Sequence, residues 1–309
     1  MVMTAMDERP TRPELDANAP LAPLTSIRVG GRADWLCTAR STRRLVEALS
    51  WARAHDVPVA VVGRGSNLIV SDEGFRGLVV RLAGALSHIS ARRDRVICGG
   101  GASLPRAVQR AAAAGLEGLE WGASIPGTVG GAVAMNAGAH GGDVADNIEW
   151  VVVCSAAGRE RLGLAELELG YRRSAIVGHQ VVALASFSLR PGDPGLIKDR
   201  LSEFRGRRRS TQPQGVRTFG SVFTNPDSDS AGRLLEAAGC KEISVGGARF
   251  SPVHANFIEA ERGCTARDVL ALMAEGRRRV VAAGGPVLVP EVRFLDPQRG
   301  IIAAPLPSP

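Results

Sequence analysis

Apolar residues recur at helical spacing in several stretches of the chain, and most of these stretches begin at a residue that can cap a helix. Leu45, Leu49 and Ala52 fall on one helical face after the potential N-cap Ser41. Ser103 can begin a second helix, which Gly115 can end. Further helices are predicted at 194–210, 230–239 and 265–285, the last of them capped by Thr265.

Short apolar runs between these stretches are typical of buried strands. They lie at 57–63, 77–82, 95–100, 148–160, 180–190 and 287–296. Pro290 falls inside the last run and favours an edge position for it, because proline cannot donate a ladder hydrogen bond. Helices and strands do not alternate regularly and no internal repeat is found, so we predict an α+β fold.

Composition adds size and charge to this picture. The chain has 309 residues, is 45% hydrophobic and carries a formal charge of +7, which suits two compact domains or one large one and an anionic partner. Only 4% of the residues are aromatic, with a single tyrosine, Tyr171. The basic clusters at 204–210 and 275–280 are therefore interpreted as solvated helix faces, and no nucleic acid is expected as a partner.

The cysteines and the N-terminal residues bear on the compartment. Five widely spaced cysteines without a CxxC pair indicate neither a disulfide framework nor a zinc site, and no metal is expected. The polar N-terminal segment has no apolar signal-peptide core, and no run approaches the ~20 apolar residues of a membrane span. We therefore expect a cytoplasmic protein without a membrane partner.

Three glycine-rich segments are the strongest chemical signal in the residues themselves. They are "GRGSNLIVSDEGFRG" at 63–77, "GGGAS" at 99–103 and "WGASIPGTVGGAVAMNAGAHGGD" at 121–143. Glycine lets main-chain N–H groups approach a bulky ligand such as a phosphate or pyrophosphate, although each loop alone could be a tight turn. The first segment lacks both the P-loop lysine and a GxGxxG pattern, so neither of those folds is supported.

Beyond these loops, a series of motifs resembles a known family. "TSIRVGGRADWL", "GRGSNLIVSDEGFRG", "SIPGTVGGAVAMNAGAHGG", "GYRRS", "FGSVFTNP", "HANFIE" and "VPEVRF" occur in the order seen in the UDP-N-acetylenolpyruvoylglucosamine reductase family. The resemblance covers about residues 21–296. Because no long insertion follows "GYRRS", it is similar to the form of the enzyme with a short C-terminal domain.

The resemblance implies a fold and a domain organisation. It implies an FAD-binding unit of the vanillyl-alcohol-oxidase type in two subdomains, followed by a smaller α+β substrate domain. The domain predictions are a disordered tail at 1–20, an FAD-binding domain at 21–205, a substrate-binding domain at 206–300 and a tail at 301–309. The two subdomains are predicted at about 21–85 and 86–205.

The resemblance also implies the cofactors and the residues that bind them. FAD would be held without a covalent bond, largely by main chain, with side-chain hydrogen bonds from Ser66, Asn67 and Asn136. The implied FAD contacts are Gly63, Gly65, Ser66, Asn67, Leu68, Ile125, Gly127, Thr128, Gly130, Gly131, Asn136 and Gly138. NADPH is the implied co-substrate. The implied reaction converts UDP-N-acetyl-3-O-(1-carboxyvinyl)glucosamine to UDP-N-acetylmuramate for peptidoglycan.

This chemistry requires charge stabilisation and a proton donor. Hydride addition to the vinyl carbon leaves negative charge at the adjacent carbon and its carboxylate, which suits the guanidinium fork of Arg172. Ser221 matches the family's proton donor and Glu291 a further catalytic acid. We expect Glu291 on a strand face with Val287, Val289 and Leu295, where an apolar setting raises the pKa of its carboxyl group.

Three residues match the family's contacts to the UDP-sugar substrate: Asn225, Lys241 and His254. Lys241 is a natural diphosphate ligand. For His254, a role in packing alone stays open.

The sequence also departs from the family pattern. Arg217, Thr218 and Phe219 replace a run of small residues, and His140 replaces a tyrosine. Thr211 replaces a lysine, so Arg208 or Arg209 is expected to supply its charge.

Two other functions are compatible with the sequence. One is a flavin oxidase of the same fold with another substrate, but such an enzyme would not explain why Arg172, Ser221 and Glu291 occur together. A non-catalytic flavin or nucleotide-sugar binding protein is favoured only by the altered run at 217–219. For the reductase, the predicted partners are the UDP-sugar and NADPH, and a monomer is expected.

Overall fold

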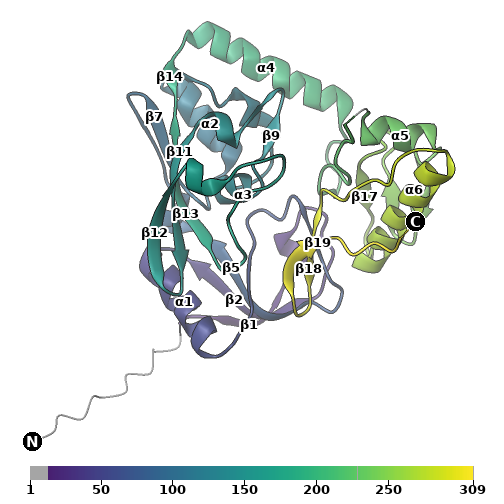
Figure 1. The fold of residues 1–309 in the computed structure, drawn as a ribbon, viewed down its shortest axis with the longest axis horizontal. Coiled ribbons are helices and arrows are strands. Elements are labelled where there is room, and N and C mark those ends of the chain that lie inside the picture. Colours follow the sequence, from purple (N-terminus) through teal and green to yellow (C-terminus); the bar gives the residue numbers. More distant parts are fainter. Residues whose placement is uncertain (1–12, 228, 309) are drawn as a thin grey trace, which may run out of the picture.

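The computed structural model describes residues 13–227 and 229–308 and divides into a larger β-rich part and a smaller helical part (Figure 1). The fold class is the predicted α+β. Helix α4 (Pro194–Thr211) runs from the larger part toward the smaller one. The Asp193 side chain caps α4 by accepting from the N–H groups of Gly195 and Leu196, and Pro194 occupies its first turn.

The first subdomain is built on a four-stranded sheet in the order β1-β2-β5-β3. Its strands are β1 (Asp16–Pro20), β2 (Arg32–Ala39), β3 (Val59–Val61) and β5 (Phe75–Leu82). Helix α1 (Thr42–Ala54) follows β2 and begins at Ser41, whose hydroxyl accepts from Arg44 N–H as the sequence predicted. Its buried face packs against β2 and against the neighbouring five-stranded sheet.

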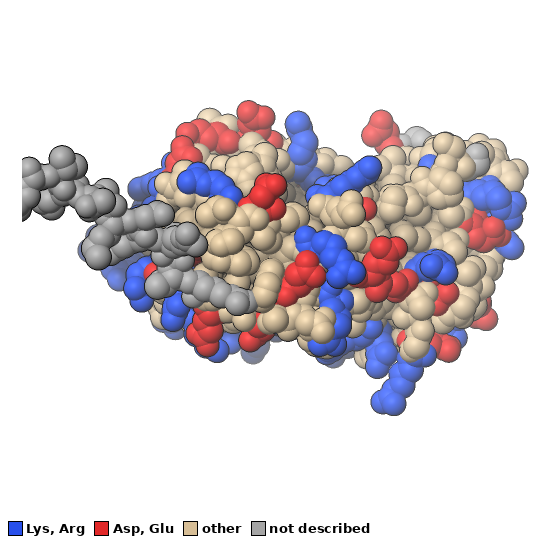
Figure 2. Space-filling view, turned by 90° about the horizontal axis from the view of Figure 1, so that it is seen from below, with Lys and Arg blue, Asp and Glu red and all other residues tan. Residues whose placement is uncertain are grey.

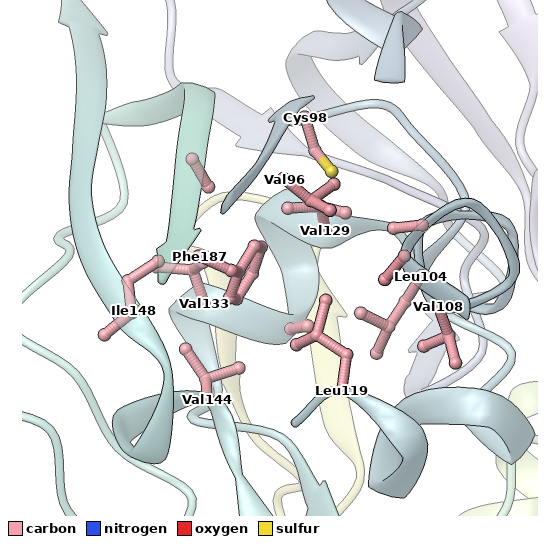
Figure 3. Close-up of a cluster of buried hydrophobic side chains, with 14 of the residues drawn as sticks. Val96, Cys98, Leu104, Val108, Leu119, Val129, Val133, Val144, Ile148 and Phe187 are labelled. Carbon is pink, nitrogen blue, oxygen red and sulfur yellow. The ribbon is translucent and has the colours of Figure 1, made fainter. Parts of the chain in front are cut away.

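The second subdomain is an antiparallel five-stranded sheet in the order β12-β11-β13-β7-β6. Its strands are β6 (Ile89–Arg92), β7 (Arg95–Gly99), β11 (Ile148–Ser155), β12 (Gly158–Gly163) and β13 (Val181–Ser188). Helices α2 (Leu104–Ala113) and α3 (Val129–Ala134) cover one face. Figure 3 shows their Leu104, Val108 and Val133 side chains in one buried cluster with Phe187 of β13.

Small two-stranded ladders complete this part of the molecule. They are formed by β9 (Gly138–Ala139) with β10 (Gly142–Asp143), and by β8 (Leu116–Glu117) with β14 (Arg190–Pro191). The first of these ladders lies within the long glycine-rich segment, so part of that segment pairs with itself.

The smaller part contains a three-stranded sheet with two helices. The strands are β15 (Ser244–Val245), β16 (Ala248–Phe250) and β17 (Ile258–Ala260), and the helices are α5 (Ala231–Ala237) and α6 (Ala266–Ala282). Thr265 begins α6 with a capping box that includes Asp268, as the pattern predicted. Ile27, Val29 and Ile69 of the first subdomain lie in the same buried cluster as this part, so the two parts share a core.

The last strands of the chain return to the first subdomain. β18 (Arg293–Asp296) pairs in parallel with β4 (Leu68–Val70) and antiparallel with β19 (Gly300–Ala303). The predicted edge position of this strand is therefore wrong: it begins only after Pro290 and has a partner on each side. Because β4 directly follows the first glycine loop, the pairing places the segment before β18 beside that loop.

Both predicted tails need correction. β1 pairs with β2 and buries Ala19, so residues 16–20 are a strand; residues 1–12 lie outside the described residues. β19 and the buried Ala304 likewise contradict the start of the predicted tail at 301–309. A polar, proline-containing composition does not reveal whether the backbone finds a partner strand. The other domain boundaries stay predictions.

Charge and hydropathy complete the description. On the face shown in Figure 2, Lys and Arg side chains are interspersed with Asp and Glu side chains. Among the residues described, no helix is both long and apolar enough to cross a membrane.

Candidate active site

Two of the glycine loops touch each other. The first (63–68) joins β3 to β4, and the second (125–131) leads into α3, where the Thr128 hydroxyl accepts from Gly131 N–H at 3.2 Å. A Cβ on Gly63 would lie only 2.4 Å from Thr128 Oγ1, so this approach requires glycine. Gly65 has a φ of +58°, and a Cβ there would lie 2.5 Å from the Leu24 carbonyl oxygen. Gly63 thus allows the two loops to pack together, and Gly65 allows the first loop to pack against the segment at Leu24 and Thr25.

Gly127 has no comparable packing reason to be glycine. A Cβ on it would meet nothing nearer than Ser66 Oγ at 3.9 Å, so its main chain is open to the close approach of a bulky group. Loops that pack together and leave such a position free fit a dinucleotide held by main chain, which is the arrangement predicted for FAD. Thr128, by contrast, uses its hydroxyl as a helix cap, and the Asn67 amide donates to the Glu291 carbonyl oxygen at 3.3 Å.

Arg172 and Glu291, which are 119 positions apart, form an ion pair. Arg172 Nε donates to Glu291 Oε1 at 3.0 Å, and the two side chains are 23% and 18% exposed. The guanidinium also donates from Nη2 to the Gly138 carbonyl oxygen at 3.0 Å and from Nη1 to that of Asn136 at 3.4 Å. Arg172 therefore links the glycine-rich segment at 121–143 to the C-terminal motif that contains Glu291.

Burial raises the pKa of the Glu291 carboxyl group, and the charge and hydrogen bond of Arg172 partly oppose this shift. The predicted direction of the shift is confirmed, but the predicted setting is wrong. Glu291 lies before β18 rather than on it, and Val287 and Val289 are 50% and 61% exposed. Glu291 is instead buried where segments distant in the sequence meet: Arg172 donates to its carboxyl group, Asn67 donates to its carbonyl oxygen, and its N–H donates to Val222.

Ser221 lies next to this ion pair in the backbone network. Glu291 N–H donates to the Val222 carbonyl oxygen at 2.9 Å, and Ser221 itself forms an isolated β-bridge with Phe257. Gly220, with a φ of +87°, comes close to Ser66 of the first glycine loop. Ser221 and Glu291 are thus carried by segments that meet at the first loop, and Arg172 joins them through its bond to Glu291.

The unusual run before Ser221 has a partly structural explanation. Phe219 is buried in the core of the smaller part, and the Arg217 carbonyl oxygen accepts from Ala260 N–H at 2.9 Å. Of the two arginines proposed to replace the family lysine, Arg208 donates to the Ser124 carbonyl oxygen beside the second loop. Arg209 is exposed. His140 stacks on Phe204 of α4, with ring centroids 4.2 Å apart.

Asn225, Lys241 and His254 form a separate group in the smaller part, each with a nearby partner. Asn225 Oδ1 accepts from Ala231 N–H at 3.0 Å at the start of α5, and Lys241 Nζ pairs with Glu236 at 2.7 Å. His254 Nδ1 accepts from Asn256 N–H at 3.2 Å. Burial, and secondarily the charge of Lys241, lower the pKa of the His254 ring. Its packing role is evident, and its substrate role stays a prediction.

No sequence pattern indicated the roles of two residues that support this site. Gly170 and Asp143 hold the Asn136 side chain, and no spacing in the sequence relates them. Within 13–227 and 229–308, no group of three or more His, Cys, Asp or Glu side chains could hold a metal ion.

Comparison with known proteins places this arrangement. Residues 33–162 match the family model of an FAD binding domain, and residues 212–295 match that of the UDP-N-acetylenolpyruvoylglucosamine reductase C-terminal domain. The chain is 44% identical over 288 residues to the UDP-N-acetylenolpyruvoylglucosamine reductase of Anaeromyxobacter sp. (strain Fw109-5), covering 93% of this chain and 91% of the relative. It is also 44% identical over 277 residues to UDP-N-acetylenolpyruvoylglucosamine reductase 2 of Symbiobacterium thermophilum, covering 89% and 90%.

A solved structure extends the similarity to the whole fold. The crystal structure of UDP-N-acetylenolpyruvylglucosamine reductase from Thermus caldophilus matches with a TM-score of 0.80 and 36% identity. The match covers 91% of this chain and 98% of that structure. It therefore includes both the glycine loops and the smaller C-terminal part.

Proposed function

Because the chain belongs to the UDP-N-acetylenolpyruvoylglucosamine reductase family, we propose that it reduces the enolpyruvyl ether of UDP-N-acetyl-3-O-(1-carboxyvinyl)glucosamine with FAD and NADPH. The product is UDP-N-acetylmuramate, a precursor of peptidoglycan. The observation that carries the proposal is the half-buried ion pair between Arg172 and Glu291, which backbone hydrogen bonds link to the Ser221 segment and to the first glycine loop.

The two loops would hold FAD mainly through the predicted main-chain contacts, because the Asn67 and Asn136 amides, which were predicted to bond to FAD, donate within the protein. The first loop would contribute main chain from Gly63 to Leu68 and the Ser66 hydroxyl. The second loop and the residues that follow α3 would contribute main chain at Ile125, Gly127, Thr128, Gly130, Gly131, Asn136 and Gly138. Held there, FAD would supply hydride chemistry, passing two electrons from NADPH to the vinyl carbon of the substrate.

Arg172 would bind the carboxylate on which negative charge develops. A guanidinium has five N–H donors, and three hydrogen bonds to Glu291, Gly138 and Asn136 leave two of them for the substrate. A charge-assisted bond to the reacting carboxylate strengthens as its charge grows, which stabilises the transition state more than the ground state. The three existing bonds fix the direction of the fork.

Ser221 and Glu291 would manage the protons. The Ser221 hydroxyl gives its proton to the carbon next to the carboxylate, a step that a weak acid can perform because the enolic species is strongly basic. The raised pKa of Glu291 keeps its carboxyl group protonated to a higher pH than a free glutamate, so that it can donate a hydrogen bond. Arg172 and Glu291 would act as one unit because each is the other's partner.

Asn225, Lys241 and His254 would bind the UDP-sugar. All three lie in the smaller part of the molecule, within the substrate domain predicted at residues 206–300. We also propose a cytoplasmic monomer. The five free cysteines support a reducing compartment, and light scattering would test the oligomeric state.

The test is to purify the protein, identify its flavin and follow NADPH oxidation with and without the enolpyruvyl substrate. We expect a yellow protein that releases FAD on denaturation and consumes NADPH rapidly only with the substrate. A colourless protein that takes up no FAD would contradict the cofactor assignment. FAD binding without substrate-dependent turnover would instead favour an oxidase with another substrate or a non-catalytic binding protein.

A further inference from the structure

Arg172 occupies a backbone conformation that needs support. It has a φ of +55°, in the left-handed region, which costs a residue with a Cβ about 1–3 kcal/mol unless its surroundings hold it. Gly170 and Arg173 exchange both of their backbone hydrogen bonds at 3.0 Å, so Tyr171 and Arg172 form the tip of a tight turn. Because Tyr171 is exposed, the turn depends on contacts at its base.

The side chain of Asn136 supplies that contact. Its Nδ2 donates to the Gly170 carbonyl oxygen and to Asp143 Oδ2, both at 3.1 Å, and its Oδ1 accepts from Ala145 N–H at 3.1 Å. Both amide hydrogens are thus used within the protein. Asn136 is only 3% exposed, so these bonds form away from solvent.

The main chain of Asn136 contacts the other end of the same arginine. Its carbonyl oxygen accepts from Arg172 Nη1, and Gly138, two residues on, accepts from Nη2. One residue therefore holds the base of the turn through its amide and the tip of the guanidinium through its carbonyl group. Asn136 itself has a φ of +37°, a conformation that asparagine tolerates better than most residues.

We propose that Asn136 is a positioning residue for Arg172, and that its side chain serves the substrate half-reaction rather than flavin binding. The proposal rests on the reductase function proposed above. With the amide removed, the Gly170 carbonyl oxygen loses a buried partner, so the turn is released and the guanidinium no longer points at one place. The flavin loops and the proton donor Ser221 are left in place.

The test variant is Asn136→Gly, which removes the amide while glycine still accepts the left-handed backbone. The matched control is Ser174→Ala. Ser174 follows the same turn, but its Oγ donates to the Ala134 carbonyl oxygen at 2.8 Å rather than to Gly170 or Arg172. Stopped-flow absorbance separates flavin reduction by NADPH from flavin reoxidation by the substrate, and flavin fluorescence gives FAD affinity.

In Asn136→Gly we expect reoxidation to be slower by roughly tenfold or more, with flavin reduction and FAD affinity within about threefold of native. Ser174→Ala should keep all three near native. In an Arg172→Ala background, Asn136→Gly should cause no further loss, because the residue it positions is already absent. An equal loss in both backgrounds would overturn the proposal, as would a tenfold loss of FAD affinity with native reoxidation.

Two further measurements test the proposal if Asn136→Gly does not fold or if the native enzyme does not turn over. Asp143→Ala removes one of the two acceptors of the Asn136 amide, together with the cap that Asp143 provides to Ala145 N–H. It should reproduce the same pattern at smaller amplitude, and native reoxidation in it would count against the proposal. The Arg172 Nε–H resonance should lose exchange protection in Asn136→Gly but not in Ser174→Ala. This readout does not depend on catalysis, so it tests positioning even if the native flavin is never reoxidised by the substrate. A native flavin that the substrate never reoxidises would contradict the proposed function, but not the positioning role of Asn136.

Discussion

The Arg172–Glu291 site and the group of Asn225, Lys241 and His254 are built in opposite ways. The contacts of Arg172 and Glu291 join residues 34, 36, 119 and 224 positions apart. The partners of Asn225, Lys241 and His254 lie 6, 5 and 2 positions away. In the first site, removing one side chain leaves its half-buried partner without a hydrogen bond. In the second, water can replace the lost hydrogen bond at the more exposed Asn225 and Lys241. Coupled effects are expected in the first and independent ones in the second.

The largest expected effect is that of Ser221→Ala. Flavin reduction by NADPH needs no carbon acid and should stay near the native rate, whereas reoxidation by the enolpyruvyl substrate should slow by about 10²–10⁴-fold. The neighbours Val222 and Phe223 stay buried, so stability should barely change. Stopped-flow traces of both half-reactions check this. Native reoxidation in the variant would show that another group donates the proton.

The next effect tests the loop packing beneath the first site. In Gly63→Ala the new Cβ would have to displace Thr128, and overpacking of this kind costs about 1–3 kcal/mol. We expect FAD affinity to fall by roughly 5–150-fold, measured by flavin fluorescence. The control is Gly206→Ala in α4, where a Cβ meets nothing within 4 Å. Equal affinities in the two variants would mean that the loop contact does not shape the FAD site.

Lys241→Ala should produce a smaller effect that is confined to substrate binding. Lys241 is 34% exposed and paired with Glu236, so solvent screens part of its charge. We expect KM for the UDP-sugar to rise by about tenfold, with an unchanged rate of flavin reduction. Lys198→Ala, on the exposed side of α4, is the control. Equal damage to both half-reactions would make Lys241 a structural or cofactor residue.

The smallest effect is a change in pH dependence. Because the pKa of Glu291 is raised in the folded state, the stability it contributes is present below the unfolded value and is lost as pH rises through the folded pKa. Glu291→Gln has no ionisable group at this position. The melting temperature of the variant minus that of the native protein should therefore increase as pH rises from about 5 to 8.

A second glutamate provides the opposite sign as a control. Hydrogen bonds from Arg278 and Arg279 lower the pKa of Glu275 to about 2, so its contribution is present above the unfolded value and lost only in acid. Glu275→Gln should therefore show a constant difference from native between pH 5 and 8. A constant difference in Glu291→Gln as well would contradict the raised pKa of Glu291.

Local signals in the sequence predicted much of the fold. Ser41 and Thr265 begin helices as expected, because a capping bond reaches only three residues along the chain. Several buried strands were also located, such as those at 77–82 and 180–190, but β2 and β4 were missed and no strand's partner was identified. The predicted tail at 16–20 is a strand, and the predicted edge strand after Pro290 lies between β4 and β19. Pairing depends on which segments meet in space, which no local pattern states.

The sequence by itself determined the candidate chemistry. The motifs identified Arg172, Ser221 and Glu291 through their resemblance to the family, and the glycine loops indicated that main chain lies close to a ligand. Only the tertiary structure decided that Gly63 serves loop packing, that Glu291 is desolvated although it lies before β18, and that Asn136 holds the turn of Arg172. Caps and periodicity act over a few residues, whereas desolvation and guanidinium orientation depend on atoms that folding brings together from 34 to 224 positions away.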